Sequence, residues 1–267
     1  MLSARDVRVA FGDRTVFENV SLELRRGEVK GLAAPNGFGK TTLLRAIAGE
    51  PCGWSCRRSG TVEADGVPVR RAARFRGRVL FVPGNAASLY AEMNARDYLT
   101  AARVLWRSLS GLSDEDRILE SRISVDDAVE ACGLSAFCAK PVARLSKGMR
   151  QQVSFAAAYI SGTPYVLFDE PFNALDPTNL ARLSRVLGAM AESGRGVLLA
   201  SHLFDEIAGL CASIAFLRPD GVDEVAFGGG SPSFSELFAA RYQAKQDIHA
   251  GREAHAGWDM RTGREAR

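Results

Sequence analysis

Apolar and polar positions alternate through most of the first 33 residues, which is the pattern of half-buried β-strands. The alternation predicts strands at VRVAF (7–11), TVFENVSLEL (15–24) and VKGLA (29–33), separated by the polar turns GDR and RRGE. A Gly-rich loop follows the third strand. The helical pattern TTLLRAIAG then begins, with Gly49 as its expected C-cap.

The middle of the chain changes its periodicity. A small hairpin is predicted around Asp65 and Gly66, and RVLFVP (78–83) has the composition of a buried strand. From about residue 89 to residue 160 the pattern is helical and more polar, with breaks at Gly111, Gly133 and Pro141. We interpret this stretch as an inserted helical lobe.

Strands and helices alternate again in the last third. The strands are predicted at YVLFDEP (165–171), GVLLASH (196–202) and SIAFLRP (213–219), with helices after Pro177 and from Phe204. Apolar strands separated by helices are typical of a parallel sheet in an α/β fold. FGGGSPS (227–233) ends the pattern, so we expect one domain over 1–230 and a C-terminal helix or flexible tail over 231–267.

Composition adds limits on the setting of the protein. The chain has 267 residues, of which 46% are apolar and 24% charged, and its net charge of +3 is too small to indicate nucleic-acid binding by itself. No apolar run approaches the roughly 20 residues that span a bilayer. The first residues lack the apolar core of a secretory signal. We therefore expect a cytosolic protein, with free thiols at its five cysteines.

The stretch GLAAPNGFGKTTLLRAIAG (31–49) carries the first candidate chemistry. Gly39, Lys40 and Thr41 fit the end of the phosphate-binding pattern G-x-x-x-x-G-K-[ST], whereas Ala34 stands at its leading glycine. Phosphate oxygens can be bound by the backbone N–H groups from Gly37 to Lys40 and by the helix N-terminus. The Lys40 ammonium can bind the β and γ phosphates, and the Thr41 hydroxyl can bind Mg²⁺. The alternative is a turn that binds no ligand.

Adjacent carboxylates, Asp169 and Glu170, end the strand YVLFDE. The carboxyl ends of parallel strands form the ligand-binding edge of such sheets. Asp169 is therefore a candidate for holding Mg²⁺ through water, and Glu170 for polarising an attacking water as general base. The alternative is a solvated strand end. Ser146 is placed to cap a helix that begins LSKGMRQQ, and His202 follows another apolar strand; neither indicates a function alone.

Together these motifs resemble the ATP-binding-cassette (ABC) ATPases over about residues 3–220, and in particular the ATP-binding subunits of transporters. The segment Ala34–Thr42 resembles the Walker A loop, LSKGM (145–149) the signature, YVLFDE (165–170) the Walker B strand, and NALD (173–176) the D-loop. His202 is similar in place to the switch histidine, and Phe11 to the aromatic residue that stacks on adenine.

The resemblance implies a fold, a mechanism and a set of ligands. The fold is an α/β P-loop NTPase core with a parallel sheet, an N-terminal antiparallel β-subdomain and an inserted α-helical subdomain. Two cassettes would enclose two ATP molecules head to tail, with Glu170 and His202 catalytic and Mg²⁺ near Thr41, Asp169 and Asn85. The residues expected to bind ATP are Phe11, Asn36, Gly37, Phe38, Gly39, Lys40, Thr41, Thr42, Ser146, Gly148 and Asp176.

The implied partners are an integral membrane permease on a separate chain and a second cassette, in a homodimer or a heterodimer. The protein would then lie on the cytoplasmic face of the cell membrane. LSKGM in place of the commoner LSGGQ favours exporter-type systems. No nucleic-acid partner is expected. Ribosome-acting relatives carry two cassettes in one chain and chromosome-maintenance relatives carry long coiled coils, and this sequence has neither feature.

Three departures from the family pattern affect the expected chemistry. An alanine at position 34 would cost roughly 1–2 kcal/mol if that backbone were left-handed. Phe38 stands where a small residue is usual and needs a pocket or a partner surface. The glutamine expected after VLFVP is replaced by Gly84 and Asn85, of which only Asn85 is a candidate substitute, with a shorter reach. We therefore expect ATP binding with slow hydrolysis or altered coupling.

Two alternatives stay open. One is a soluble or hydrolysis-impaired cassette that acts as a regulatory switch, which Ala34 and Gly84 favour and Glu170 and His202 oppose. The other concerns RRAARFRGR (70–78), whose arginines form either a solvated face or a surface near anionic lipid headgroups.

Overall fold

The computed structural model describes residues 1–51, 53, 55–85, 89–108, 123–201, 208–227 and 232–242. The chain divides into two compact units, Met1–Gly229 and Gly230–Arg267. The second unit contains a described helix over residues 234–242. The rings of Phe234, Phe238 and Tyr242 follow one another along it, with centroids 5.5 and 4.7 Å apart.

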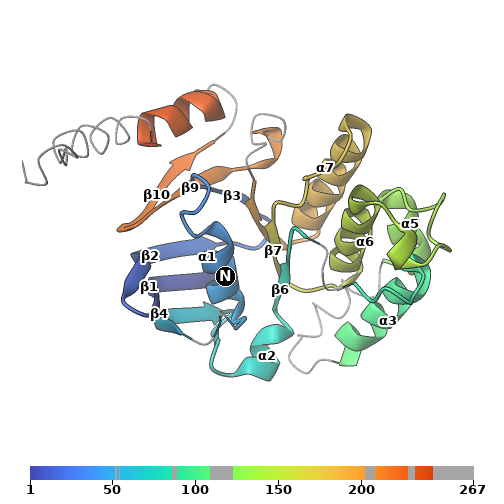
Figure 1. The fold of residues 1–267 in the computed structure, drawn as a ribbon, viewed down its shortest axis with the longest axis horizontal. Coiled ribbons are helices and arrows are strands. Elements are labelled where there is room, and N and C mark those ends of the chain that lie inside the picture. Colours follow the sequence, from blue (N-terminus) through green and yellow to red (C-terminus); the bar gives the residue numbers. More distant parts are fainter. Residues whose placement is uncertain are drawn as a thin grey trace, which may run out of the picture. The chain divides into compact units, whose positions relative to one another are not determined.

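An antiparallel sheet forms the N-terminal part of the first unit, as predicted (Figure 1). Its strands lie in the order β2 (Arg14–Leu24), β1 (Leu2–Phe11), β4 (Cys56–Ala64) and β5 (Val67–Pro68). The predicted hairpin is confirmed, since Ala64 pairs with Val67 across Asp65 and Gly66. Alternate residues such as Val7, Val9 and Phe17 are buried, which explains the period of two in the sequence.

The central sheet has six strands, in the order β10 (Gly221–Ala226), β9 (Ser213–Arg218), β3 (Val29–Ala33), β8 (Gly196–Ala200), β7 (Tyr165–Asp169) and β6 (Val79–Val82). The five strands from β9 to β6 are parallel, as predicted, whereas β10 runs antiparallel to β9. Every residue of β3, β7 and β8 is buried, as in a parallel sheet covered on both faces. The sequence pattern did not predict β10, a strand at the edge of this sheet that contains Asp223 and Glu224.

Two helices cover the central sheet near the candidate site. Helix α1 (Lys40–Ala48) contacts β1 as well as β6 and β7, so it joins the two sheets (Figure 1). Its expected C-cap, Gly49, has a left-handed φ of 72°. Helix α7 (Pro177–Glu192) packs on β8 and β3 and begins with Pro177 at its first turn, as predicted.

The described part of the helical lobe contains α3 (Ala95–Ser108), α5 (Val125–Ala131), a 3₁₀ turn η1 (Val142–Arg144) and α6 (Lys147–Ile160). The helices α3, α5 and α6 contact one another, and α6 also contacts β6 and α7. A short helix α2 (Ala72–Arg76) and a 3₁₀ turn η2 (Ala208–Leu210) lie outside this lobe. The predicted break at Gly111 and the predicted helix start at Phe204 lie outside the described residues.

A buried arginine joins α6 to the central sheet. Arg195 precedes β8 and is 2% exposed. Its guanidinium donates hydrogen bonds to the carbonyl oxygens of Ala158, Tyr159 and Thr163 at 2.8, 2.9 and 2.8 Å. Two of these carbonyls belong to the last turn of α6, where the Ala158 carbonyl also accepts from the Ser161 N–H at 3.3 Å and from the Ser161 hydroxyl at 2.8 Å. Arg195 therefore fixes the C-terminal end of this helix against the sheet.

Cysteine chemistry departs from the prediction at one position. Cys132, Cys138 and Cys211 are free thiols, but Cys56 is disulfide-bonded, so the expectation of free thiols was wrong there. Within the described ranges, helices are either too short or too polar to span a bilayer.

Candidate nucleotide site

The loop between β3 and α1 has the backbone of a phosphate cradle. Gly37 and Gly39 have φ angles of 83° and 95°, a left-handed region that favours glycine. Gly39 is also sterically required, because a Cβ there would stand 2.7 Å from Cγ1 of Val16. No side chain caps α1, and its first turn has no acidic residue. Its N-terminal N–H groups therefore remain available to an anion.

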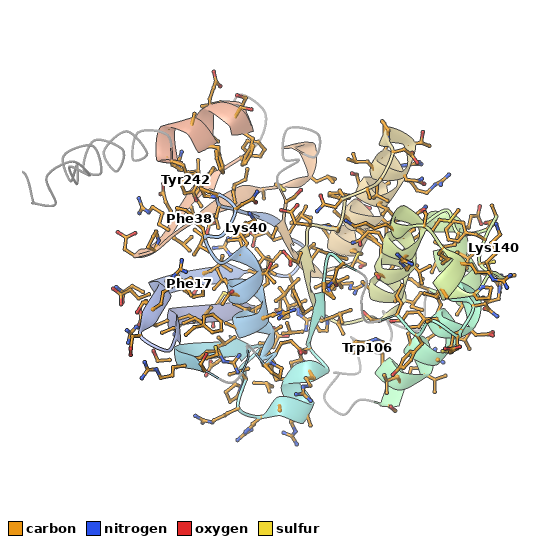
Figure 2. The ribbon with its side chains drawn as sticks, in the orientation of Figure 1. Phe17, Phe38, Lys40, Trp106, Lys140 and Tyr242 are labelled. Atoms are coloured by element: carbon orange, nitrogen blue, oxygen red, sulfur yellow. The ribbon has the colours of Figure 1, made fainter. Side chains whose placement is uncertain are left out.

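Lys40 lies at the start of α1, where Figure 2 shows it beside Phe38. Its side chain is largely buried, and Nζ donates a hydrogen bond to the Ala34 carbonyl at 2.8 Å. Ala34 itself does not have a positive φ. The strain considered for an alanine at this position therefore does not arise, and its methyl group is buried beside the loop.

The loop and the end of β7 share one pocket of about 330 Å³. Its lining consists of Pro35, Asn36, Gly37, Gly39, Lys40, Thr41, Thr42, Asp169 and Glu170. Inside it, the Thr41 hydroxyl donates to Oδ2 of Asp169 at 2.7 Å. Burial raises the pKa of Asp169, and the Thr41 hydrogen bond and the charge of Lys40 oppose that rise. A hydroxyl and a carboxylate in contact are oxygen donors of the kind that Mg²⁺ prefers, so this pair fits the metal.

Glu170 stands in a strained backbone conformation at the rim of this pocket. Its φ is 48°, which is costly for a residue with a side chain, and its N–H donates to the Ala200 carbonyl on β8 at 2.7 Å. The hydrogen bond holds the turn that directs the chain away from β7. The strain thus lies at the residue that the sequence identifies as the candidate general base.

The segment after β6 leaves no room for a side chain at position 84. A Cβ on Gly84 would stand 2.3 Å from the Asp169 carbonyl oxygen. Asn85 is exposed and does not line the nucleotide pocket. The structure therefore does not bring Asn85 together with Thr41 and Asp169 in that pocket.

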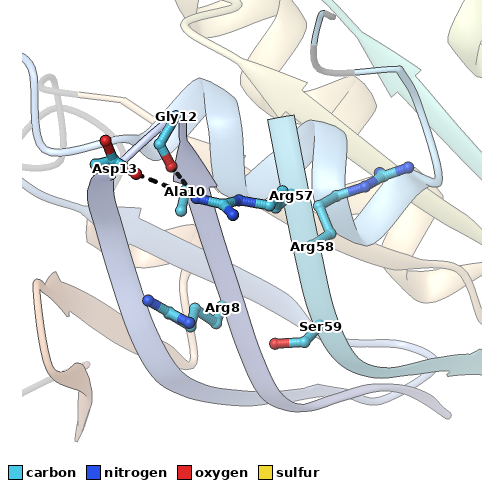
Figure 3. A pocket seen from close by; sticks show the side chains of 7 residues that line it. All are labelled: Arg8, Ala10, Gly12, Asp13, Arg57, Arg58 and Ser59. Atoms are coloured by element: carbon cyan, nitrogen blue, oxygen red, sulfur yellow. Dashed lines mark hydrogen bonds and ion pairs between the residues drawn. The ribbon is translucent and has the colours of Figure 1, made fainter. Parts of the chain in front are cut away.

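Phe11 lies at the end of β1, half-buried, outside the pocket of the phosphate loop. The turn that follows it is held by Arg57, which donates a hydrogen bond to the Gly12 carbonyl and pairs with Asp13 at 3.7 Å (Figure 3). Sequence reasoning missed Arg57, because its partners lie far away in the sequence, in the turn between β1 and β2. Phe38 is 37% exposed at the tip of the phosphate loop.

The candidate signature lies on α6, away from the phosphate-loop pocket. Ser146 is exposed and caps the helix by accepting a hydrogen bond from the Met149 N–H at 3.2 Å. The first turn of α6 has no acidic residue and includes the exposed Lys147. Gly148 packs closely on the D-loop, since a Cβ there would stand 2.6 Å from the Ala174 carbonyl oxygen. This helix N-terminus thus has the charge for an anion but does not reach the pocket of its own chain.

Asp176 caps α7 in this structure. Its carboxylate accepts hydrogen bonds from the backbone N–H and the side-chain amide of Asn179, at 2.9 and 2.7 Å. These bonds lower the pKa of Asp176. His202, the candidate switch histidine, lies outside the described residues.

Comparisons with known proteins agree with this geometry. The family model described as "ABC transporter" matches residues 17–173. The ATP-binding protein NatA of Bacillus subtilis is 30% identical over 243 residues, which cover 88% of this chain and 92% of NatA. The lipopolysaccharide export ATP-binding protein LptB of Escherichia coli is 30% identical, with 79% of this chain and 83% of LptB covered. The cytochrome c biogenesis export protein CcmA of Pseudomonas savastanoi is 34% identical over 71% of this chain and 82% of CcmA.

Solved structures show the same fold. An ATP-binding subunit of an ABC transporter superposes with a TM-score of 0.70 at 23% identity, covering 94% of this chain and 98% of the other. The dimeric cassette MJ0796, in a post-hydrolysis state with ADP and Pi, also gives a TM-score of 0.70, at 22% identity and with 85% and 98% covered. The predicted fold class is confirmed by these likenesses.

Proposed function

The chain belongs to the ABC transporter family and is one of its ATP-hydrolysing subunits, and on that premise we propose that two cassettes close over two ATP molecules to drive transport. One observation carries this proposal. The phosphate loop and the Walker B carboxylates share a pocket, while the second anion-binding helix end, at Ser146, lies outside it. Each pocket is therefore complete only when another cassette supplies its signature helix.

Within one chain, the phosphate loop binds and orients ATP. The N-terminus of α1 and the Lys40 ammonium receive the β and γ phosphates, and Lys40 exchanges its Ala34 carbonyl for a phosphate oxygen. Phe11 supports the adenine ring, and Arg57 fixes the turn beside it. Mg²⁺, held near Thr41 and Asp169, would neutralise phosphate charge.

Hydrolysis then depends on Glu170 and on the partner cassette. Glu170 accepts a proton from the attacking water as general base. Ser146 and the N-terminus of the other chain's α6 hold the γ-phosphate, and Lys147 adds positive charge there. Loss of that phosphate removes the bridge between the two cassettes, and the dimer opens. His202 is proposed to contact the γ-phosphate beside Glu170.

The proposed partner is an integral membrane permease, which places the protein at the cytoplasmic face of the membrane. A groove of about 80 Å³ between β6 and the helical lobe supports a docking site, lined by Leu80, Phe81, Val82, Pro83, Tyr98, Ala102, Trp106, Ser154, Ala157 and Ala158. Trp106 marks its position in Figure 2. Val104 and Leu105, large apolar residues on the same helix α3, are exposed.

We propose export as the direction of transport. The relatives LptB and CcmA are described as export proteins, and LSKGM favours the same class. In cells that lack this chain, the exported compound should accumulate inside and decrease in the medium. The reverse distribution would indicate import.

The first test uses Glu170→Gln protein, in which hydrolysis is blocked and the ATP-bound state persists. With Mg-ATP it should elute as a dimer in gel filtration, and Lys40→Ala in the same background should remain a monomer. A persistent Glu170→Gln monomer at saturating ATP would contradict a homodimer and favour a heterodimer. A tagged pull-down from solubilised membranes should then recover a polytopic membrane protein.

A regulatory switch is the second candidate, and the crowding at Gly84 favours it, because it excludes the usual glutamine from that position. Steady-state ATPase measurements separate the two functions. Turnover that responds to the recovered permease supports the transporter. ATP binding without turnover, in the presence of that permease, supports the switch.

A further inference from the structure

A buried amide connects the helical lobe to the start of α7. Gln152 lies on α6 and is 4% exposed. Its Nε2 donates one hydrogen bond to the Cys132 carbonyl at the end of α5 and another to Oδ1 of Asn179 on α7, both at 2.9 Å. A single side chain thus bridges three helices.

Asn179 continues this connection to the D-loop. Its Nδ2 donates to Oδ2 of Asp176 at 2.7 Å, while its Oδ1 accepts from Gln152 and also from Arg182, the latter at 3.1 Å. Asp176, Asn179 and Gln152 therefore form a continuous chain of hydrogen bonds. One end is the D-loop and the other is the second turn of the signature helix.

A second, independent contact joins the same two segments. Ala174 has a left-handed φ of 68°. Its carbonyl oxygen lies so close to Gly148 that a Cβ on Gly148 would stand 2.6 Å from that oxygen. The D-loop is also tied to the catalytic residue, because the Asn173 N–H donates to the Glu170 carbonyl at 3.3 Å. A displacement at Glu170 therefore has a direct structural route to α6.

We propose that Gln152 and Asn179 are positioning residues that make the D-loop (173–176) and the signature helix α6 move as one body. The consequence rests on the proposed function: the D-loop is bonded to Glu170, which lines the ATP pocket of its own chain, whereas α6 serves the ATP of the partner. The amide link then couples the two ATP sites, so that a change at one Glu170 alters how tightly the same chain holds the other γ-phosphate.

The mechanical link is tested first, in the nucleotide-free protein, by hydrogen–deuterium exchange. Asn179→Ala keeps the backbone N–H that caps α7 through Asp176, but it removes the bridge to Gln152. Exchange should rise in residues 146–150 and 173–176 together and stay unchanged in the phosphate loop. Thr178→Ala, an exposed neighbour in the same turn, is the matched control and should change neither segment. Unchanged exchange at 146–150 in Asn179→Ala would overturn the link.

The coupling is tested by the ATP dependence of hydrolysis. Two coupled sites allow a Hill coefficient of up to about 2. The Hill coefficient should fall towards about 1, and to the same extent, in Asn179→Ala, in Gln152→Ala and in the double variant. The affinity of the monomer for ATP should be unchanged in all three. Additive effects in the double variant, or a wild-type Hill coefficient in Asn179→Ala, would contradict the proposal.

The two experiments separate this inference from the proposed function. If wild-type protein neither dimerises nor hydrolyses ATP, the proposed sandwich is wrong, and the exchange experiment still decides whether the D-loop and α6 move together. If Gln152→Ala does not fold, Asn179→Ala alone carries both measurements, because Asn179 is only partly buried.

Discussion

Gly84 lies against the backbone of Asp169 so closely that any Cβ at position 84 would stand 2.3 Å from the Asp169 carbonyl oxygen. Glycine, which stands here in place of the usual glutamine, thus permits the close approach of this segment to β7. The segment after β6 and the Walker B strand are packed backbone to backbone. Restoring the side chain requires the two to separate.

Gly84→Gln is therefore expected to damage the site, although it restores the family residue. Overpacking against a fixed backbone typically costs about 1–3 kcal/mol of unfolding free energy. Urea unfolding should show this loss, and ATPase turnover should fall, because Asp169 and Glu170 are displaced. Asn85→Gln is the control for stability, since Asn85 is exposed. A Gly84→Gln protein with faster turnover and unchanged stability would show that the segment moves freely.

Ala34→Gly tests the other departure in the phosphate loop. Ala34 is buried and does not have a positive φ, so a glycine gains no conformational advantage there. ATP affinity, measured by isothermal titration calorimetry, should be unchanged. The unfolding free energy should fall by about 0.5–1 kcal/mol, because glycine makes the unfolded chain more flexible than alanine does. Clearly tighter ATP binding by Ala34→Gly would mean that the alanine does strain the loop.

Local signals were sufficient for much of the site. Ser146 caps α6 and Gly49 ends α1 as the sequence predicts, because such caps depend on a few neighbouring residues. The apolar strands before Ala34 and Glu170 were likewise readable, and their shared sheet brings both motifs to one pocket. Local patterns do not identify the partner that a residue contacts in a distant part of the chain.

Three of the features that sequence reasoning missed depend on distant partners. The acceptors of Arg195 lie 32 to 37 positions earlier in the chain. Gln152 reaches Asn179 only because α6 packs on α7. The space at Gly84 is limited by a carbonyl on the neighbouring strand. Strand β10 was missed for a different reason, since its polar residues do not form a clear alternation.

Arg195 provides a prediction about the end of α6. Arg195→Lys keeps the positive charge, but one ammonium group cannot replace the three separate nitrogen donors of the guanidinium. The Tyr159 and Thr163 carbonyls should lose their donor, at ~1–3 kcal/mol each, so the unfolding free energy should fall by about 2–6 kcal/mol. Urea denaturation measures this, with the exposed Arg144→Lys as control. Equal stability of the two variants would mean that the buried bonds contribute no more than a surface charge.

Asp65 predicts how stability depends on pH. Burial disfavours its charge, but hydrogen bonds from Arg26, the N-terminal ammonium and Tyr165 outweigh this and lower the pKa of Asp65 to about 2. A lowered carboxyl pKa stabilises the fold above the ordinary value of about 4, and that stability is lost as pH falls towards 2.

Asp65→Asn should therefore lower the unfolding free energy by about 2 kcal/mol at pH 7. The difference from wild type should shrink between about pH 4 and pH 2. Asparagine tolerates the left-handed φ of 47° at this turn, so the substitution adds no backbone strain. Asp220→Asn, on an exposed pair with Arg218, should show almost no difference at either pH. A gap between Asp65→Asn and wild type that stays constant down to pH 2 would contradict the proposed origin of the stability.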